Sequence, residues 1–486
     1  MRRSLFLFAT VMVVAASLTV QAQDAGKWDL RRVVEYAMEK NINVRQVEIT
    51  ARTSAIDLKQ SKLDRYPSLN FSGGHGFSFG RSLDYSTNVY TDNNLMYEQM
   101  GLSSQVTIFN WNSKNNLVKA NSFTNQADVA AIDKAKNDVA LDAARQYLVV
   151  LMDKEQVEIT SVQLQQSKAQ LSNTRKLVDA GSLPELNAAE LEAQVARDSA
   201  SLITAQTQVE ADRLTLKSIL SLPADVPFEL ETPPVDKIPI DNILEISPAE
   251  VYTLAMNTQP QVKVNNLRLK AAEKSYLVSR ARQYPTISIS GQLGSAFNSS
   301  FKSLNAVILA DQVTPAYALN GTDKYYIYSP QTGYVTSKKN FGQLWDGYGS
   351  QLKNNFGQGI SIGLNVPIFN GWSARANVER SKWVIDARKL TIEQDTLALK
   401  QNVYSAYNLA MGAFQTYIAN QKAVATAEKS FDLATKRYNI GVMQTIEWLT
   451  NQTALFNAKI NLVRSQFDYV FKMKVLEYYK GLGLRL

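Results

Sequence analysis

Few residues in this chain could carry out catalysis or bind a metal. The sequence has no cysteine and a single histidine, His75, so thiolate metal sites, cysteine nucleophiles and histidine-rich metal centres are excluded. One enzyme motif is present, because Gly359 to Gly363 match G-x-S-x-G around Ser361, and His75 is the one imidazole that could serve as its base. That motif works at a sharp turn from a strand into a helix, whereas the alternating residues around Ser361 predict the middle of a strand. We therefore expect no catalytic residue, no cofactor and no metal, and we keep a hydrolase acting through Ser361 as a hypothesis.

The charged residues are mixed in sign and scattered along the chain. The sequence has 52 Lys and Arg against 44 Asp and Glu, a net charge of +8. A nucleic-acid-binding protein usually gathers its basic residues on one face or arm, so we expect no nucleic-acid partner. At the beginning, Arg2 and Arg3 precede an apolar stretch, and residues 1–22 have the order of regions that is typical of a signal peptide. No apolar run of about 18 residues follows, so we expect an exported chain without a transmembrane helix.

The sequence also resembles itself. Residues 33–73 align with 251–291 without a gap, and VTIFN at 106–110 aligns with VPIFN at 366–370. These matches predict an internal two-fold repeat. The expected organisation is a first repeat at 23–220, a proline-rich linker at 221–249, and a second repeat at 250–486 that carries an extended external loop at about 295–355.

Each repeat is predicted to contain three helical segments. The first, over 30–64 and again over 248–282, ends at a Tyr-Pro pair, because proline disfavours helix in the residue before it. The second is very long, over 113–180 and 373–440, since these stretches hold no proline and almost no glycine.

The third helical segment follows a glycine, Gly181 or Gly441, that is expected to reverse the chain. In this return helix apolar residues recur every seven residues, which is typical of coiled-coil packing. Asp198 and Asp212 interrupt the first of these repeats. They are either tolerated polar interruptions or part of a wall that faces a wet lumen.

Four segments between the helices alternate between large apolar and small polar residues, which is the period of a β-strand. Their large side chains are predicted to face lipid, with the small polar ones facing water; they are Leu69, Phe71, Val106, Ile108, Ile287, Ile289, Ile360, Ile362, Leu364 and Val366. A half-buried sandwich in a soluble protein would show the same alternation. Four strands cannot close a membrane barrel, and an open edge is costly in lipid, so strands in a membrane would have to be pooled by several chains.

Together these features resemble the TolC-type outer-membrane efflux protein family. The most specific parts are the two Tyr-Pro junctions, VPIFNGW at 366–372, AGSLPELNAAELEAQ at 180–194 and RYNIGVMQTIEWLTNQTALFNAK at 437–459. The resemblance implies a mixed α and β membrane protein that forms a homotrimer. Long helices would form a trimeric α-barrel, and four strands per chain would form a 12-stranded β-barrel.

The resemblance also implies a function and partners. The protein would be the channel-tunnel of a tripartite efflux or type I secretion system, lying in outer-membrane lipid of a Gram-negative-type bacterium and extending into the periplasm. A periplasmic adaptor and an inner-membrane transporter of the RND, ABC or MFS type would dock at the helical hairpin tips, which hold Gly181, Ser182, Leu183, Gly441, Val442 and Met443. The alternative from the helices alone is a trimeric coiled-coil structural or adhesive envelope protein without a lumen.

The family's tunnel constriction carries over to this chain only in part. Tyr438 matches the family tyrosine and Glu447 matches the first acidic position, whereas Thr450 stands at the second acidic position. Met443 stands where the family has an arginine, and Asn187 stands where it has an aspartate. The resemblance therefore implies a constriction at Glu447 without the usual ion-paired network. The loop at 295–355 is expected either to be a plain solvated loop or to cap the pore and meet a partner outside the cell.

Overall fold

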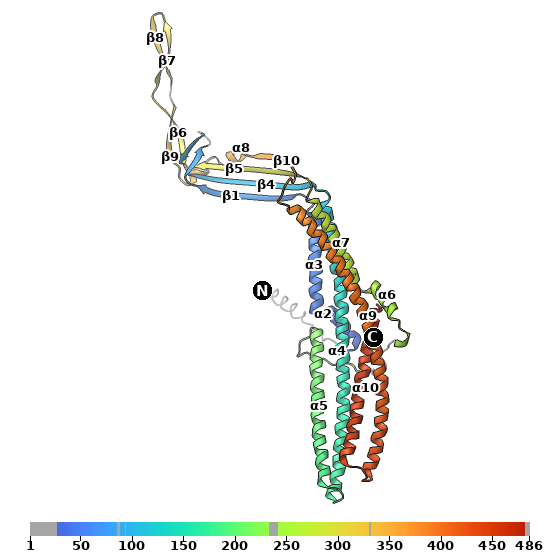
Figure 1. The fold of residues 1–486 in the computed structure, drawn as a ribbon. Helices are drawn as coiled ribbons and strands as arrows, with labels where there is room; N and C mark the ends of the chain where they lie inside the picture. The colour runs from blue at the N-terminus through green and yellow to red at the C-terminus, as the bar shows by residue number, and fades with distance from the viewer. Residues whose placement is uncertain (1–26, 85–87, 93, 233–241, 330–331, 482–486) are drawn as a thin grey trace, which may run out of the picture. The chain divides into compact units, whose positions relative to one another are not determined.

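The computed structural model describes residues 27–84, 88–92, 94–232, 242–329 and 332–481, so the predicted signal peptide at 1–22 lies outside the described residues. The chain forms two compact units (Figure 1). One unit comprises Met1–Ala55, Ser122–Ala271 and Ile385–Leu486, and it is helical. The other comprises Ile56–Asn121 and Ala272–Val384, and it holds the strands.

Two long helices and two return helices dominate the helical unit. Helix α4 spans Ser113–Asp179 and α9 spans Ser373–Asn439, each with 67 residues. Each is followed by a tight turn and a helix of 35 residues, α5 over Glu185–Ile219 and α10 over Thr445–Tyr479. The turns contain Gly181 and Gly441 at φ values of 70° and 75°, a left-handed conformation that glycine adopts at little cost. The predicted long helices and glycine reversals are thus confirmed.

The shorter helices differ from the prediction, because each is broken once. The segment at 30–64 forms α2 over Leu30–Lys40 and α3 over Ile42–Leu63, and the segment at 248–282 forms α6 over Pro248–Thr258 and α7 over Pro260–Ala281. The single helices expected over 30–64 and 248–282 were therefore wrong. Pro260 explains the second break, since a residue before proline avoids helical backbone.

The break residues have a structural task. The Asn41 side-chain amide donates to the carbonyl oxygen of Ile219 at 2.7 Å, and the Gln259 amide donates to that of Tyr478 at 3.3 Å. These acceptors lie in the last turns of α5 and α10, where carbonyl groups have no partner within the helix. The residue at each break thus donates a hydrogen bond to a carbonyl group at the end of a return helix.

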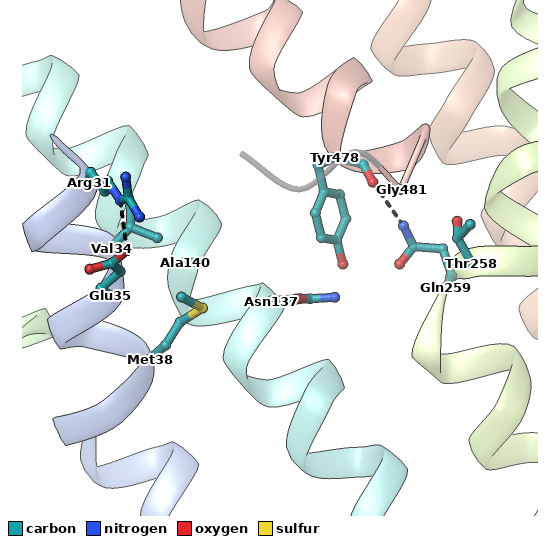
Figure 2. A pocket seen from close by; sticks show the side chains of 10 residues that line it. All are labelled: Arg31, Val34, Glu35, Met38, Asn137, Ala140, Thr258, Gln259, Tyr478 and Gly481. Atoms are coloured by element: carbon teal, nitrogen blue, oxygen red, sulfur yellow. Dashed lines mark hydrogen bonds and ion pairs between the residues drawn. The ribbon is translucent and has the colours of Figure 1, made fainter. Parts of the chain in front are cut away.

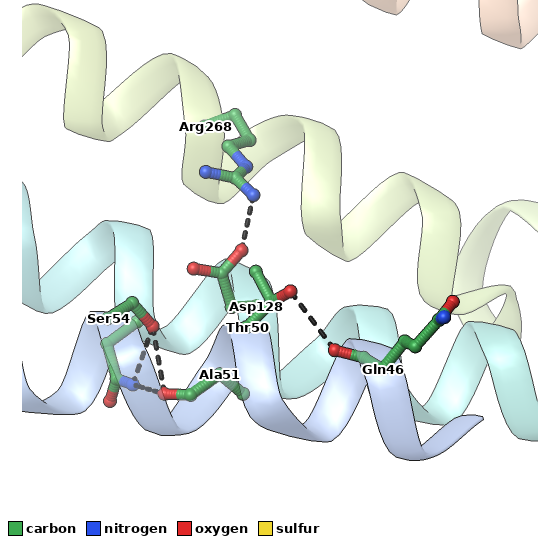
Figure 3. A network of polar contacts seen from close by, with 7 residues as sticks. Gln46, Thr50, Ala51, Ser54, Asp128 and Arg268 are labelled. Carbon is green, nitrogen blue, oxygen red and sulfur yellow. Dashed lines mark hydrogen bonds and ion pairs between the residues drawn. The ribbon is translucent and has the colours of Figure 1, made fainter. Parts of the chain in front are cut away.

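Apolar packing and ion pairs between helices hold the helical unit together. One core cluster surrounds Tyr147, and a second surrounds Met473. Figure 3 shows Arg268 of α7 reaching the buried Asp128 of α4, close to Ala51 and Ser54 of α3. Because Arg268 and Asp128 are 140 residues apart, the pair ties distant parts of the sequence together. Among the described residues, no helix is both long enough and apolar enough to cross a bilayer.

The strand unit contains one four-stranded antiparallel sheet. Its members are β1 (Ser68–Ser78), β4 (Leu95–Phe109), β5 (Thr286–Ser300) and β10 (Gly357–Asn365), in the order β1-β4-β5-β10. The four predicted strands are therefore confirmed, and β1 and β10 form the two edges. The prediction that Val366 lies in the last strand was wrong by one residue, since pairing ends at Asn365 and Pro367 cannot donate to a ladder.

The register of this sheet places most of the large side chains on one face, whereas Ile108 lies in a bulge where Phe109 pairs with Ile287 instead. Val106, Ile289 and Ile362 lie side by side across β4, β5 and β10, and Ile287 pairs with Leu364. Leu69, Phe71, Ile108, Ile360, Ile362 and Leu364 are exposed, and Val106, Ile287 and Ile289 are half-buried. With Leu69 73% and Ile360 85% exposed, this face is not the interior of a sandwich within one chain.

The expected loop at about 295–355 is mostly regular structure instead. Strand β5 continues to Ser300 and is followed by two antiparallel ribbons. The ribbons pair β6 (Lys302–Ile308) with β9 (Thr332–Lys338), and β7 (Gln312–Asn320) with β8 (Asp323–Ser329). A 3₁₀ turn, η3 (Gly342–Trp345), and a short helix, α8 (Tyr348–Asn354), complete it. The remaining elements are β2 (Arg81–Asp84), β3 (Val89–Asp92) and η2 (Ile243–Glu245).

Candidate functional site at the helical hairpin tips

The two hairpin tips have the same backbone design. In the first, the Gly181 N–H donates to Val178 O at 2.8 Å and the Ser182 N–H to Leu177 O at 2.8 Å. In the second, the Gly441 N–H donates to Tyr438 O at 3.0 Å and the Val442 N–H to Arg437 O at 3.1 Å. These bonds satisfy carbonyl groups at the end of a long helix, so both tips are well-defined turns.

The structure brings the two tips together around one cleft of about 1010 Å³. Its lining includes most of the residues predicted for docking and constriction, namely Ser182, Leu183, Asn187, Tyr438, Gly441, Val442, Met443 and Glu447. Gly181 lies in the adjoining turn, whereas Thr450 faces solvent and its hydroxyl donates to Ile446 O at 2.8 Å. The cleft is therefore formed by α4, α5, α9 and α10 together.

An aromatic cluster packs between α9 and α10 inside the second hairpin, and Leu191 of α5 belongs to the same core. The ring of the buried Trp448 lies 5.4 Å from that of Tyr438 and 5.6 Å from that of Phe431. The Trp448 indole N–H donates to the Thr435 hydroxyl at 3.0 Å, so its polar atom is satisfied. Sequence reasoning missed Trp448, although an aromatic residue among the polar residues of a tip is a signal that could have found it.

Tyr438 contacts both hairpins of its own chain. Its hydroxyl lies 3.4 Å from that of Thr174 on α4 and 3.3 Å from that of Thr445 on α10. Met443 packs against the Trp448 cluster, and Asn187 lies half-buried in the cleft. Glu447 is exposed in the first turn of α10, where a carboxylate is favoured by the helix dipole. The cleft thus places Tyr438, Asn187 and Glu447 together, held by hydrogen bonds and packing.

Replacement of Trp448 tests this cluster. Trp448→Phe keeps a ring but removes the N–H donor and some volume, so we expect a loss of about 2 kcal/mol in the free energy of unfolding. Thermal unfolding followed by circular dichroism measures it. Thr435→Val removes only the acceptor, so its loss should be smaller and should not add to that of Trp448→Phe in the double variant. Full additivity would contradict the contact.

A buried polar cluster lies further along the hairpins. The Asp198 carboxylate accepts a hydrogen bond from Ser167 at 2.6 Å and another from Gln194 at 2.8 Å, and Gln452 of α10 lies 3.4 Å from Ser167. All four side chains are buried. Asp198 is therefore a hydrogen-bonded interruption of the apolar repeat within one chain, which agrees with the first of its two interpretations.

Asp212, the second interruption, lies beside another carboxyl group. Burial and a hydrogen bond with Asp212 raise the pKa of Asp153 to about 7. For Asp212, burial favours the neutral form, but hydrogen bonds from Gln208, Asp153 and Gln146 outweigh it and lower the pKa. The neutral form of Asp153 on α4 is therefore favoured beside the ionised, half-buried Asp212 on α5.

A separate groove of about 500 Å³ lies where the end of α10 meets α2, α4 and the break at Gln259 (Figure 2). Arg31 pairs with Glu35 along its rim, and Gln259 points toward the Tyr478 carbonyl oxygen. Burial raises the pKa of Tyr478 to about 12, so its hydroxyl stays protonated at physiological pH. Within the described part of the chain, no three acidic or imidazole side chains are arranged to hold a metal ion.

The hydrolase hypothesis fails on geometry. Ser361 lies within β10, and its hydroxyl is 2.8 Å from that of Ser290 on β5. His75 lies on β1, at the opposite edge of the sheet, with its Nδ1 3.7 Å from Glu98 and its ring stacked on Trp345. Three strand spacings of about 4.8 Å separate the two edges, so His75 cannot serve as a base for Ser361 of the same chain.

The sequence matches a known protein family. The family model described as "Outer membrane efflux protein" matches residues 33–221 and 343–470. The outer membrane protein TolC of Salmonella enteritidis is 24% identical over 151 residues, which are 31% of this chain and 29% of that protein. The chain thus matches less than a third of the length of that relative.

Two other proteins are similar over most of the chain. Toxin and drug export protein A of Aggregatibacter actinomycetemcomitans is 18% identical over 442 residues, which are 91% of this chain and 83% of that protein. A crystal structure of CusC, described with transmembrane channel formation, has a TM-score of 0.72 at 16% identity and covers 95% of each chain. The latter similarity concerns the fold.

Proposed function

Because this chain belongs to the outer membrane efflux protein family, we propose that it is a passive conduit from the periplasm to the exterior. It is a protein of the Gram-negative outer membrane and not an enzyme. The conduit would be the outer component of a tripartite efflux or type I secretion system. A periplasmic adaptor would couple it to an inner-membrane transporter of the RND, ABC or MFS type.

The open sheet is the observation that carries this proposal. Strands β1 and β10 each pair with a strand on their inner side, and on their outer side no strand of the described chain pairs with them. In lipid, the backbone N–H and C=O groups on that outer side need hydrogen-bond partners. Three antiparallel pairings separate these edges, so β1 and β10 run in opposite directions. The β10 edge of one copy can therefore pair with the β1 edge of the next in the antiparallel manner of the whole sheet. Three copies would close a barrel of 12 strands, with the large side chains toward lipid and the serines and glycines toward water.

The helices next to these edges support the same assembly. Helix α3, which precedes β1, carries Ile42, Ile49, Ile56 and Leu63 at seven-residue intervals. Helix α9, which follows β10, carries Trp383, Leu390, Leu397 and Tyr404 at the same interval. These eight side chains are 39% to 71% exposed in the single chain, and we call them the α3 stripe and the α9 stripe. A seven-residue apolar interval is suited to a neighbouring helix, so the α3 stripe of one copy would pack on the α9 stripe of the next.

The cleft between the tips is the proposed docking site for the adaptor. Leu177, Leu186, Ile440, Val442 and Ile446 are exposed around it, which is unusual for the end of a helical hairpin in water. Glu447, repeated in three copies, would narrow the closed end and attract cations. A trimeric coiled coil without a lumen would leave the uncovered sheet face without a role.

Conductance in planar bilayers tests the conduit and Glu447 together. The purified protein should form pores that prefer cations, and Glu447→Gln should lower the cation-to-anion permeability ratio toward one because each copy loses a negative charge. Glu185→Gln, at an exposed acid in the first turn of α5, is the matched control and should change the ratio less.

The result separates the hypotheses. Absence of any conductance, together with extraction from membranes without detergent, would favour the structural coiled coil. Conductance with an unchanged ratio in Glu447→Gln would remove the proposed role of that residue and leave the conduit intact.

A further inference from the structure

The two ribbons between β5 and η3 form an extension, and one face of its β7–β8 ribbon carries three exposed tyrosines. In the β7–β8 ribbon, Val313 pairs with Tyr328 and Tyr317 pairs with Tyr326, and Leu319 lies two residues beyond Tyr317. Because residues that pair directly, or lie two apart, share a face, these five side chains lie on one side. We call them the tyrosine face, and all five are 44% to 63% exposed. Ala318, Asn320, Asp323, Tyr325 and Ile327 occupy the opposite face.

This ribbon cannot bury its own aromatic face. It has two strands, so no second layer of the described chain covers it, and an isolated two-stranded hairpin is at best marginally stable in water. Exposed apolar faces and open strand edges also invite uncontrolled association. The tyrosine face therefore calls for a specific partner.

The charges of the extension favour an identical partner. Residues 302–338 carry Lys302, Lys324 and Lys338 against Asp311 and Asp323, which is 3 − 2 = +1. On the tyrosine face Lys324 is the one charged residue, and its ammonium lies 4.6 Å from the centre of the Tyr317 ring of the same chain. A second copy of this face would thus bring one ammonium group to the contact, which already lies over a tyrosine ring of its own chain. Tyrosine with small polar neighbours is also a composition typical of protein interfaces.

The contacts at the base of the extension determine where the extensions of several copies would lie. The Phe301 N–H donates to Asn94 O at 2.9 Å, and the Lys339 N–H donates to Phe301 O at 2.8 Å. The Phe301 ring lies 6.2 Å from those of Phe77 and Phe79. These contacts anchor the extension beside the first residue of β4 and the last residue of β5, so three copies in one barrel would raise three extensions from the same rim.

We propose that the tyrosine faces of three copies pack against one another as a three-sided prism above the sheet. This inference rests on the proposed homotrimer and adds a contact outside the barrel and the helices. The prism would cover the apolar face that each ribbon leaves open, and it would stand over the outer mouth of the conduit.

Single cysteines test the contact cleanly because the chain has none of its own. In Leu319→Cys the thiol lies on the tyrosine face, and in Ala318→Cys the neighbouring thiol lies on the opposite face. Under mild oxidation of the assembled protein in detergent, Leu319→Cys should form disulfide-linked dimers in high yield. Ala318→Cys should form few.

A tyrosine pair gives a second measurement. Tyr326 and Tyr325 are adjacent and similarly exposed, but they lie on opposite faces. Tyr326→Ser should lower the temperature at which the trimer dissociates by a few degrees, and Tyr325→Ser should leave it unchanged.

Sedimentation in detergent distinguishes the possible failures. Trimers whose Leu319→Cys and Ala318→Cys variants cross-link equally, or not at all, would overturn the prism while leaving the conduit standing, as expected if the tyrosine face serves a foreign protein. Absence of trimers in the unmodified protein would overturn the proposed assembly and the prism with it.

Discussion

The variant Leu390→Glu is expected to sediment as a monomer in detergent, whereas the unmodified protein sediments as a trimer. Leu390 is 66% exposed in the single chain and lies in the middle of the α9 stripe. Burying a leucine contributes about 2 kcal/mol, and a trimer contains three copies of the contact. The carboxylate would also have to be desolvated three times in an apolar seam. We therefore expect loss of the trimer rather than a graded weakening.

Leu390→Met is the matched control, since it keeps an apolar side chain of similar volume and should remain trimeric. Ile49→Glu on the α3 stripe should behave as Leu390→Glu does, because the two stripes are proposed to face each other across copies. Circular dichroism should show helical monomers in both cases, as neither side chain belongs to a core cluster of its own chain. A trimer that tolerates Leu390→Glu would refute the proposed seam.

The second large effect concerns the carboxyl pair of α4 and α5. The pKa of Asp153 is raised to about 7, so between pH 4 and 7 the folded chain holds a proton that the unfolded chain has released. Stability must therefore fall as the pH rises through this interval and stay low above it. The shift from 3.8 to about 7 limits the loss to about 4 kcal/mol. Asp153→Asn should abolish the fall, and the variant should be more stable than the parent at pH 8 and equal to it near pH 3.

Melting temperatures measured from pH 3 to 9 check this expectation. Asp212→Asn is the control with the opposite sign, because Asp212 has a lowered pKa and accepts hydrogen bonds from Gln146 and Gln208. A lowered pKa stabilises the fold above the unfolded value, so Asp212→Asn should reduce stability at neutral pH. An unchanged pH dependence in Asp153→Asn would show that Asp153 is not the titrating group.

Much of the fold could be predicted because its signals are local. The long helices follow from stretches that lack proline and almost lack glycine, the reversals from Gly181 and Gly441, and the strands from alternation after a Tyr-Pro pair. The ribbons at 302–338 also carry a local signal in the spacing of Tyr326 and Tyr328 around Ile327. Their regular structure was missed because the segment was interpreted by composition alone.

Other features depend on contacts between distant residues. Asn41 sits in a sequence that suits a helix, and the break there is held by a carbonyl group 178 residues away. Asp198 is satisfied by Ser167 on another helix, and Trp448 joins α10 to α9 through Thr435 and Phe431. These contacts cannot be read from spacing along the chain, so the packing of the predicted site residues at the tips was not foreseen.

The clamps at Asn41 and Gln259 have a mechanical consequence. Each fixes the end of a return helix that is remote from the tip, and 35 residues of helix extend from that fixed end for about 52 Å. A lever of that length converts a tilt of about 5° into a displacement of about 5 Å at the far end. Side chains at the second tip, such as those of Val442 and Glu447, can therefore be displaced by about 5 Å while the residues at the pivot, with its two amide contacts, hardly move.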